Sequence, residues 1–204
     1  MTLLRGYSDD KLLMDWLQKD IWPCEGKFAN DRTDFIYVSS LLGIAEMIRS
    51  GTTCYNDMYN YPGELARATA KARIRGVIGG TLMTQDWLPP IAEQFTVNER
   101  VMEEYRDTPL ITFSCAPHAP YTVNDEMFVQ CRDWMTRYTN TFMHLHLHET
   151  KTEVSDSIVL TKVPPCHLSD QAMSPLNNLH RLQLVNSRLT AVHMTALTDD
   201  EIAL

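Results

Sequence analysis

Three histidines alternate with apolar residues in one short segment, and a glutamate follows the last of them. His144, His146 and His148 stand in the run FMHLHLHET, with Glu149 directly after His148. In a β-strand alternate residues share one face, so the three imidazoles are expected to project the same way. Each buried imidazole needs partners for two nitrogens, so packing alone explains three of them poorly. The pattern favours a metal-binding or catalytic site over the alternative, an exposed edge strand with solvated histidines.

Side chains nearby could complete such a site. Residues two apart on a strand lie about 7 Å apart, so one histidine is expected to bind a metal while the others sit deeper or on the rim. Glu149 lies just past the strand, where a carboxylate can move protons beside water acidified by a divalent ion. His193 ends a later apolar run, LTAVH, and is expected at the same mouth. His118, between Pro117 and Pro120, stands in a stiff loop suited to a substrate hydrogen bond, or it braces that loop.

Short apolar runs alternate with helical periodicity along the chain. Strands are expected at 52–57, 76–82, 110–116, 141–148 and 189–193. Helices are expected at 10–22, ended by Pro23, and at 34–50, 63–75, 98–106, 124–138 and 175–182. Asn124 is expected to cap its helix, and the pair Thr198 and Glu201 predicts the start of one more. The segment 150–174 lacks periodicity and is predicted as an irregular loop.

This alternation predicts parallel βαβ units and therefore an α/β fold. A doubly wound sheet and a (β/α)₈ barrel share the pattern, but no GxGxxG opens a helix, which weakens a dinucleotide-binding sheet. In a barrel, catalytic side chains follow the C-terminal ends of strands. Polar residues occur at such places here, namely Asp57, His118, His146, Glu149 and His193. Five strands cannot close an eight-stranded barrel, so 1–204 is predicted to be a single partial barrel or an open sheet.

Composition argues against several other classes of protein. Lys and Arg number 18 against 26 Asp and Glu in 204 residues, and no basic cluster offers a surface to nucleic acid or anionic lipid. No apolar run approaches the ~20 residues that span a bilayer, and the N-terminus lacks a signal-peptide layout. Five cysteines without CxxC spacing favour reduced thiols and a cytoplasmic location. From composition alone, Trp16 and Glu25, near the first helix, are expected to have structural roles.

Several segments resemble the amidohydrolase superfamily, in its branch of 5′-methylthioadenosine/S-adenosylhomocysteine deaminases and related s-triazine hydrolases. They are MTLLRGYSDD, GTTCYNDMY, CAPHAPYT, HLHLHET and AVHMTALTDDEIAL. The resemblance implies a (β/α)₈ barrel, of which the chain would hold about strands 2 to 6, and a bound Zn²⁺ or another divalent metal. It implies that His146 is the metal ligand after strand 5 and that Glu149 is the catalytic proton shuttle. His193 resembles the histidine that stabilises the attacking hydroxide.

The resemblance also implies which residues contact the substrate. His118 resembles the histidine that contacts a purine ring, Glu25 the carboxylate that holds the ribose hydroxyls, and Trp16 an aromatic wall of the pocket. The expected reaction is hydrolytic deamination of an adenosine-type nucleoside, which makes the enzyme a hydrolase acting on carbon–nitrogen bonds other than peptide bonds. The alternative within the superfamily is an s-triazine or guanine-type hydrolase, acting on another aminated heterocycle.

Two parts of the family's metal site have no counterpart in the sequence. One is an HxH that precedes the segment matching Met1–Gly6, and the other is an Asp after strand 8. The resemblance therefore predicts a fragment that is inactive in isolation. Exposed barrel edges would favour a homo-oligomer, and the alternative from another class is a non-catalytic remnant that survives by self-association. The stretch around Val163–Met173 is longer than the family's link, and Gly79–Pro90 has no Arg to bind an amino-acid carboxylate.

Overall fold

Helices and strands alternate along the chain, as the sequence predicts. The computed structural model describes residues 2–28, 33–160 and 173–204. Two compact units make up the chain, and each is described by itself. The first comprises the residues up to Gly80 together with Gln85–Phe113, and the second comprises Thr81–Thr84 with Ser114–Leu204. The strand ladders in the described part of the chain are parallel, which confirms the α/β class.

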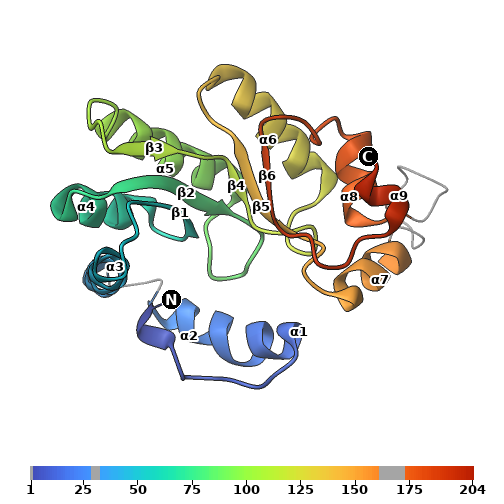
Figure 1. The fold of residues 1–204 in the computed structure, drawn as a ribbon, viewed down its shortest axis with the longest axis horizontal. Helices are drawn as coiled ribbons and strands as arrows, with labels where there is room; N and C mark the ends of the chain where they lie inside the picture. The colour runs from blue at the N-terminus through green and yellow to red at the C-terminus, as the bar shows by residue number, and fades with distance from the viewer. Residues whose placement is uncertain (1, 29–32, 161–172) are drawn as a thin grey trace. The chain divides into compact units, whose positions relative to one another are not determined.

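The first unit is built on three parallel strands in the order β1-β2-β3. β1 (Cys54–Tyr59) pairs with β2 (Arg75–Leu82), and β2 pairs in turn with β3 (Ile111–Phe113). The helix α3 (Thr33–Arg49) precedes β1, α4 (Pro62–Ala72) connects β1 to β2, and α5 (Ile91–Glu104) connects β2 to β3 (Figure 1). The apolar faces of α4 and α5 form a core with the strands, and its buried members are Leu65, Ala66, Ile78, Val101 and Ile111. A separate cluster joins α3 to α4 through Ile44, Ala68 and Ile74.

The first long helix runs through Pro23, so the prediction that Pro23 ends it was wrong. After η1 (Thr2–Leu4), the helices α1 (Leu13–Trp16), η2 (Leu17–Ile21) and α2 (Trp22–Phe28) follow one another without a break. η2 is a π-helical turn, in which the N–H of Trp22 bonds to the carbonyl of Leu17. A proline lacks an N–H, and its ring clashes with the carbonyl four residues earlier. The wider turn just before Pro23 relieves that clash, so the helix continues.

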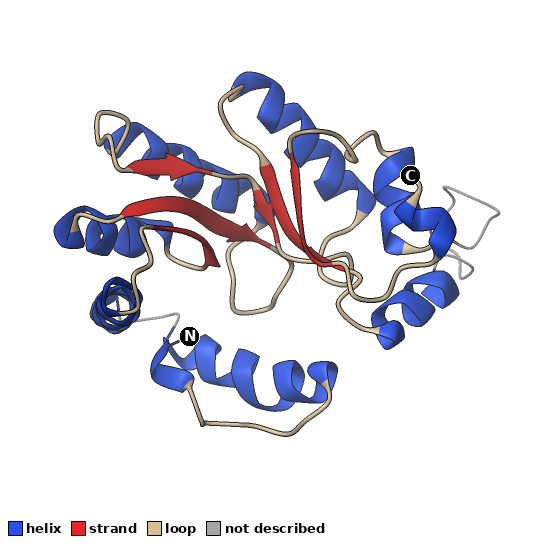
Figure 2. Cartoon of the chain, in the orientation of Figure 1, coloured by secondary structure: helices blue, strands red, loops and turns tan. Residues whose placement is uncertain are grey.

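The second unit contains a second set of parallel pairs. Thr81 and Leu82, at the end of β2, pair with β4 (Ala116–Pro117). β5 (Met143–Leu147) pairs with β6 (Leu189–His193), and a bridge from Cys115 to Met143 joins β5 to the β4 segment. The helices are α6 (Asp125–Arg137), α7 (Lys151–Leu160), α8 (Pro175–Arg181) and α9 (Asp199–Ile202). Figure 2 shows α6 alongside β5 and β6.

Helix caps predicted from sequence are present in the second unit. The side chain of Asn124 accepts a hydrogen bond from the N–H of Met127 at the start of α6. Thr198 and Glu201 form the reciprocal bonds of a capping box at the start of α9. These caps satisfy backbone N–H groups that a helix leaves unpaired in its first turn. Local side-chain chemistry therefore determines where these two helices begin.

Most predicted boundaries differ from the structure by a few residues, and three differences are larger. The segment 150–174 was predicted as a loop but contains the ten-residue helix α7. The strand expected at 110–116 is interrupted at Ser114–Cys115, which separates β3 from β4. α5 begins at Ile91, well before the expected start at residue 98, and Pro90 occupies its N-cap position. Residues 161–172, including Cys166 and most of the long link expected around Val163–Met173, lie outside the described residues.

Two further findings concern the whole described chain. Cys24, Cys54, Cys115 and Cys131 are free thiols. Within the residues that are described, no helix has both the length and the apolar character needed to cross a membrane.

Candidate active site

His146 lies on β5 with its ring nitrogens clearly distinguished. Its Nδ1 is 2.8 Å from the carbonyl oxygen of His118. A carbonyl only accepts hydrogen bonds, so Nδ1 is the donor, and in a neutral imidazole Nε2 then has the lone pair. Histidine metal ligands commonly donate one ring N–H to a carbonyl group. This bond orients the ring so that the other nitrogen can bind the metal. His146 therefore fits the predicted role of a metal ligand through Nε2.

Glu149 and His193 come together at the C-terminal ends of β5 and β6. The Oε1 atom of Glu149 is 3.4 Å from Nε2 of His193. The ring of His193 stacks on that of His146, with centroids 5.5 Å apart and planes inclined by 27°. His193 and the following Met194 have φ of 79° and 53°, a left-handed conformation that is unfavourable for residues other than glycine. Such strained positions cluster at functional sites, which supports the assignment of this pair.

His118 completes the cluster from the loop after β4. Its ring centroid is 5.0 Å from that of His146 and 5.6 Å from that of Tyr121, which it meets edge to face. Nδ1 of His118 lies 2.9 Å from the hydroxyl of Thr122. Burial, together with the neighbouring His146, lowers the pKa of His118 to about 3. The ring is therefore neutral near pH 7 and can exchange hydrogen bonds with a neutral heterocycle without adding charge.

His144 lies on β5 two residues before His146, and the centroids of the two rings are 6.5 Å apart. It is 7% exposed, and burial lowers its pKa to about 4. Its Nδ1 has no hydrogen-bond partner among the described residues. His144 is buried, as expected for the histidine that lies deeper, and the role of His146 as the metal ligand stays a prediction.

His148 departs from the predicted alternation. β5 ends at Leu147, and His148 has a φ of 51° that turns the chain away from the strand. Its ring is completely buried. Nδ1 bonds to the carbonyl of Ala196 at 2.9 Å, and Nε2 accepts the N–H of Leu176 at 3.0 Å. Both nitrogens are used by the backbone, so the expectation that all three rings share one functional face was wrong for His148.

Trp16 and Glu25 belong to the first unit. The indole N–H of Trp16 donates to the carbonyl of Ser8 at 2.9 Å. Glu25 is 8% exposed and is hydrogen-bonded to the hydroxyl of Tyr59. Burial raises the pKa of Glu25 and also that of Tyr59, so the tyrosine remains a protonated donor to the carboxyl. Burial of a carboxyl group costs free energy, so buried carboxyl groups occur more often in binding sites than in stable cores.

Glu25→Gln is expected to raise stability at neutral pH. The pKa of Glu25 is raised on folding, so its contribution to stability is complete below the unfolded pKa and is lost as pH rises through the folded pKa. The amide escapes that loss and can still accept the hydrogen bond from Tyr59. Thermal unfolding should show a higher midpoint for the variant at pH 8 and none of this gain at pH 4. The exposed Glu93→Gln is the control, and a lower midpoint for Glu25→Gln at pH 8 would contradict the expectation.

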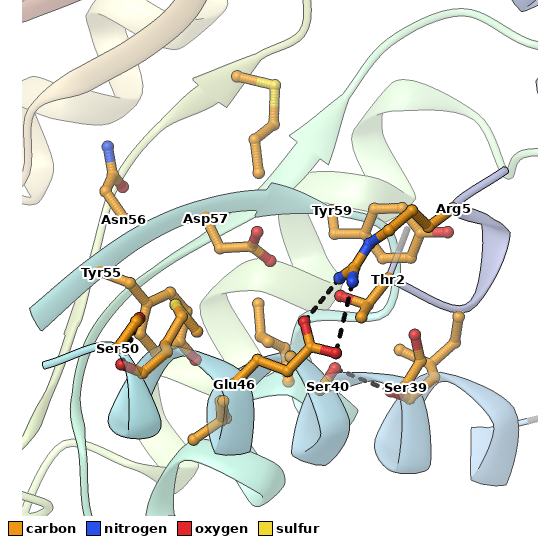
Figure 3. Close-up of a pocket in the computed structure, with 16 residues that line it drawn as sticks. Thr2, Arg5, Ser39, Ser40, Glu46, Ser50, Tyr55, Asn56, Asp57 and Tyr59 are labelled. Atoms are coloured by element: carbon orange, nitrogen blue, oxygen red, sulfur yellow. Dashed lines mark hydrogen bonds and ion pairs between the residues drawn. The ribbon is translucent and has the colours of Figure 1, made fainter. Parts of the chain in front are cut away.

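The first unit also contains a cavity of about 600 Å³ between α3 and β1. Figure 3 shows the Asp57 side chain directed from β1 toward α3, with the Arg5–Glu46 ion pair near it. Burial raises the pKa of Asp57. The sequence predicts Asp57 near a strand end, but it contains no signal for the serines of α3 that also line this cavity.

A metal ion needs more ligands than His146 alone. Among the residues that the structure describes, no group of three or more His, Cys, Asp or Glu side chains could surround an ion. The donor chemistry of His146 fits zinc or a similar ion, since a neutral imidazole nitrogen is one of the common zinc ligands.

Comparison with known proteins decides the family. The sequence model of the amidohydrolase family matches residues 1–204. The chain belongs to the amidohydrolase family. The resemblance predicted from the motifs is therefore confirmed, and with it the relationship to a fold of the barrel type.

The chain is similar to curated nucleoside deaminases. A 5′-deoxyadenosine deaminase of Methanothrix thermoacetophila is 38% identical over 99% of this chain and 44% of its own length. A 5-methylthioadenosine/S-adenosylhomocysteine deaminase of Saccharophagus degradans is 34% identical over 100% of this chain and 43% of its own length. Deaminases are hydrolases of carbon–nitrogen bonds, the enzyme class predicted from the sequence. The chain spans less than half the length of these relatives.

A solved structure gives the same result for the fold. The zinc-bound crystal structure of an adenosine deaminase from Xanthomonas campestris superposes with a TM-score of 0.86 and 40% sequence identity. The match covers 99% of this chain and 44% of that one.

Proposed function

We propose that the chain is part of a divalent-metal-dependent aminohydrolase that removes the amino group of an adenosine-type nucleoside. The observation that carries the proposal is the cluster at the ends of β5 and β6. There the carboxylate of Glu149 lies 3.4 Å from His193, whose ring stacks on His146. The names of the relatives support an adenosine-type substrate such as 5′-methylthioadenosine, S-adenosylhomocysteine or 5′-deoxyadenosine.

Residues 1–204 would correspond to about strands 2 to 6 of a (β/α)₈ barrel. His146 would hold the metal through Nε2, and the other ligands would come from parts of the relatives' length that this chain does not span. When bound, a divalent ion of this kind makes water acidic enough to serve as a nucleophile near neutral pH.

Glu149 would move the protons of the reaction. Hydrolytic deamination joins the water oxygen to the ring carbon that bears the amino group, and the carbon–nitrogen bond then breaks. The carboxylate of Glu149 can take a proton from the water, pass it to the ring nitrogen, and help the amino group to leave as ammonia. His193, at 3.4 Å, would hold the attacking oxygen in place through its ring nitrogen.

Neutral side chains would recognise the purine, and a carboxylate would recognise the sugar. His118, with its low pKa, would exchange a hydrogen bond with the purine ring. Glu25, held by Tyr59, would bind the ribose hydroxyls, and Trp16 would form an aromatic wall of the pocket. The alternative within the family is a guanine-type or s-triazine hydrolase. It differs in that its substrate has no ribose for Glu25 to bind. A cytoplasmic location and a homo-oligomer stay predictions.

The test is ammonia release by the complete native polypeptide reconstituted with Zn²⁺. We expect turnover of the adenosine-type nucleosides, loss of activity on chelation and recovery on return of the metal. Residues 1–204 alone are expected to release no ammonia. A preference for guanine or an aminotriazine would support the alternative. If no aminated heterocycle yields ammonia from the metal-loaded protein, the proposed function is wrong and a non-catalytic remnant becomes the better account.

A further inference from the structure

Side chains fix the backbone on both sides of Glu149. The N–H of Glu149 donates to Oε2 of Glu153 at 2.6 Å, and the N–H of His148 donates to Oε1 at 3.2 Å. The hydroxyl of Thr195 lies 3.1 Å from the carbonyl oxygen of His148 and 2.8 Å from that of Glu149. The two peptide groups that flank the α-carbon of Glu149 therefore have defined partners.

Glu153 lies in the first turn of α7, where its own N–H donates to the hydroxyl of Thr150 at 3.0 Å. This is the Thr-x-x-Glu pattern of a capping box, in which the glutamate ordinarily bonds to the backbone N–H of the capping residue. Here the carboxylate extends further, to the two residues that precede Thr150. Glu153 is 8% exposed. A buried carboxylate is costly unless hydrogen bonds compensate it. The backbone donors offset part of this cost, but burial still raises the pKa of Glu153.

The backbone that Glu153 holds is in an unfavourable conformation. His148 has a φ of 51°, which residues other than glycine adopt only when surrounding contacts impose it. The direction of the Glu149 side chain, and hence its 3.4 Å approach to His193, depends on this turn. A displacement of about 1 Å at a catalytic group can cost about 100-fold in rate.

We propose that Glu153 is a positioning residue for Glu149, because its carboxylate fixes the turn from which the catalytic carboxylate projects. The inference rests on the proposed function, in which Glu149 transfers the proton. Glu153 contacts no reacting atom. It acts through the peptide groups of His148 and Glu149.

The test is a double-mutant cycle in the complete zinc-loaded polypeptide. Glu153→Ala removes both acceptors, and Glu153→Gln keeps one carbonyl oxygen and the shape. Each is made alone and together with Glu149→Gln, and Asp156→Asn, an exposed acid on the same helix, is the matched control. The readouts are kcat, KM, zinc content and hydrogen exchange of the amides of His148 and Glu149.

A positioning role predicts a selective loss. Glu153→Ala should lower kcat about 10–100-fold with little change in KM or zinc content, and Glu153→Gln should lower it less. In the Glu149→Gln background the further loss should be under about 2-fold, because residues that act as one unit are not additive. Exchange of the two amides should accelerate in both single variants.

Other outcomes overturn the inference. Equal losses in both backgrounds would show a general structural role, and unchanged amide exchange would show that Glu153 does not hold the turn. If Glu153→Ala fails to fold, Glu153→Gln carries the same comparison. If the wild-type protein deaminates nothing, the proposed function fails, and amide exchange alone decides whether Glu153 holds the turn.

Discussion

Glu149→Gln is expected to lower kcat for deamination by about 10²- to 10⁴-fold, the range that a positioned proton-transfer group contributes. The amide has nearly the same size and can still approach His193, but it cannot take a proton from water. Because the substitution leaves the predicted binding groups His118 and Glu25 in place, KM should change little. The measurement is steady-state ammonia release by the metal-loaded complete polypeptide with 5′-methylthioadenosine.

The control for this variant is Glu126→Gln, an exposed glutamate in the same unit at the start of α6. It should retain the full rate. Zinc content should be equal in both variants, since His146 supplies the predicted ligand. A Glu149→Gln enzyme that keeps wild-type kcat would show that another group transfers the proton, and the pairing with His193 would then have no catalytic meaning.

The cluster could be predicted from sequence because its residues occupy strand ends. β6 has the predicted bounds, and His146, Glu149 and His193 follow apolar runs that form parallel neighbours. The ends of parallel strands that lie side by side meet at one edge, so the type of fold alone brings these residues together. His118 needed one step more, since its loop is placed by pairing between β2 and β4.

The sequence also contains a signal for the helix α7. Thr150 and Glu153 have the same spacing as Thr198 and Glu201, which were recognised as a capping box. The segment after Thr150 lacks clear apolar periodicity, however, and this feature predicts a loop. The consequence was that Glu153, the residue that bonds to the N–H of Glu149, was assigned to a loop.

Other features depend on tertiary contacts that spacing does not encode. The left-handed backbone at His148 and His193 has no sequence signal, because non-glycine residues adopt it only under the constraint of their surroundings. The burial of Glu25 and its bond to Tyr59 join residues from α2 and β1, far apart in the chain. Pairings of this kind follow from the packed structure, so sequence patterns alone assigned Glu25 no more than a structural role.

His148→Phe is expected to destabilise the protein by about 3 kcal/mol. The variant keeps a ring, but the N–H of Leu176 and the carbonyl of Ala196 lose the ring nitrogens to which they bond. The loss of a partner by a buried polar group costs about 1–3 kcal/mol. Urea unfolding of the purified protein measures the difference. The exposed His180→Phe on α8 is the matched control and should change stability by less than about 0.5 kcal/mol. If His148→Phe were as stable as wild type but lost its zinc, His148 would be a ligand after all. A destabilised variant that still binds zinc through His146 would instead show that the alternating histidines have different roles. His146 would then act in the candidate active site, and His148 would connect the end of β5 to α8 and to the segment after β6.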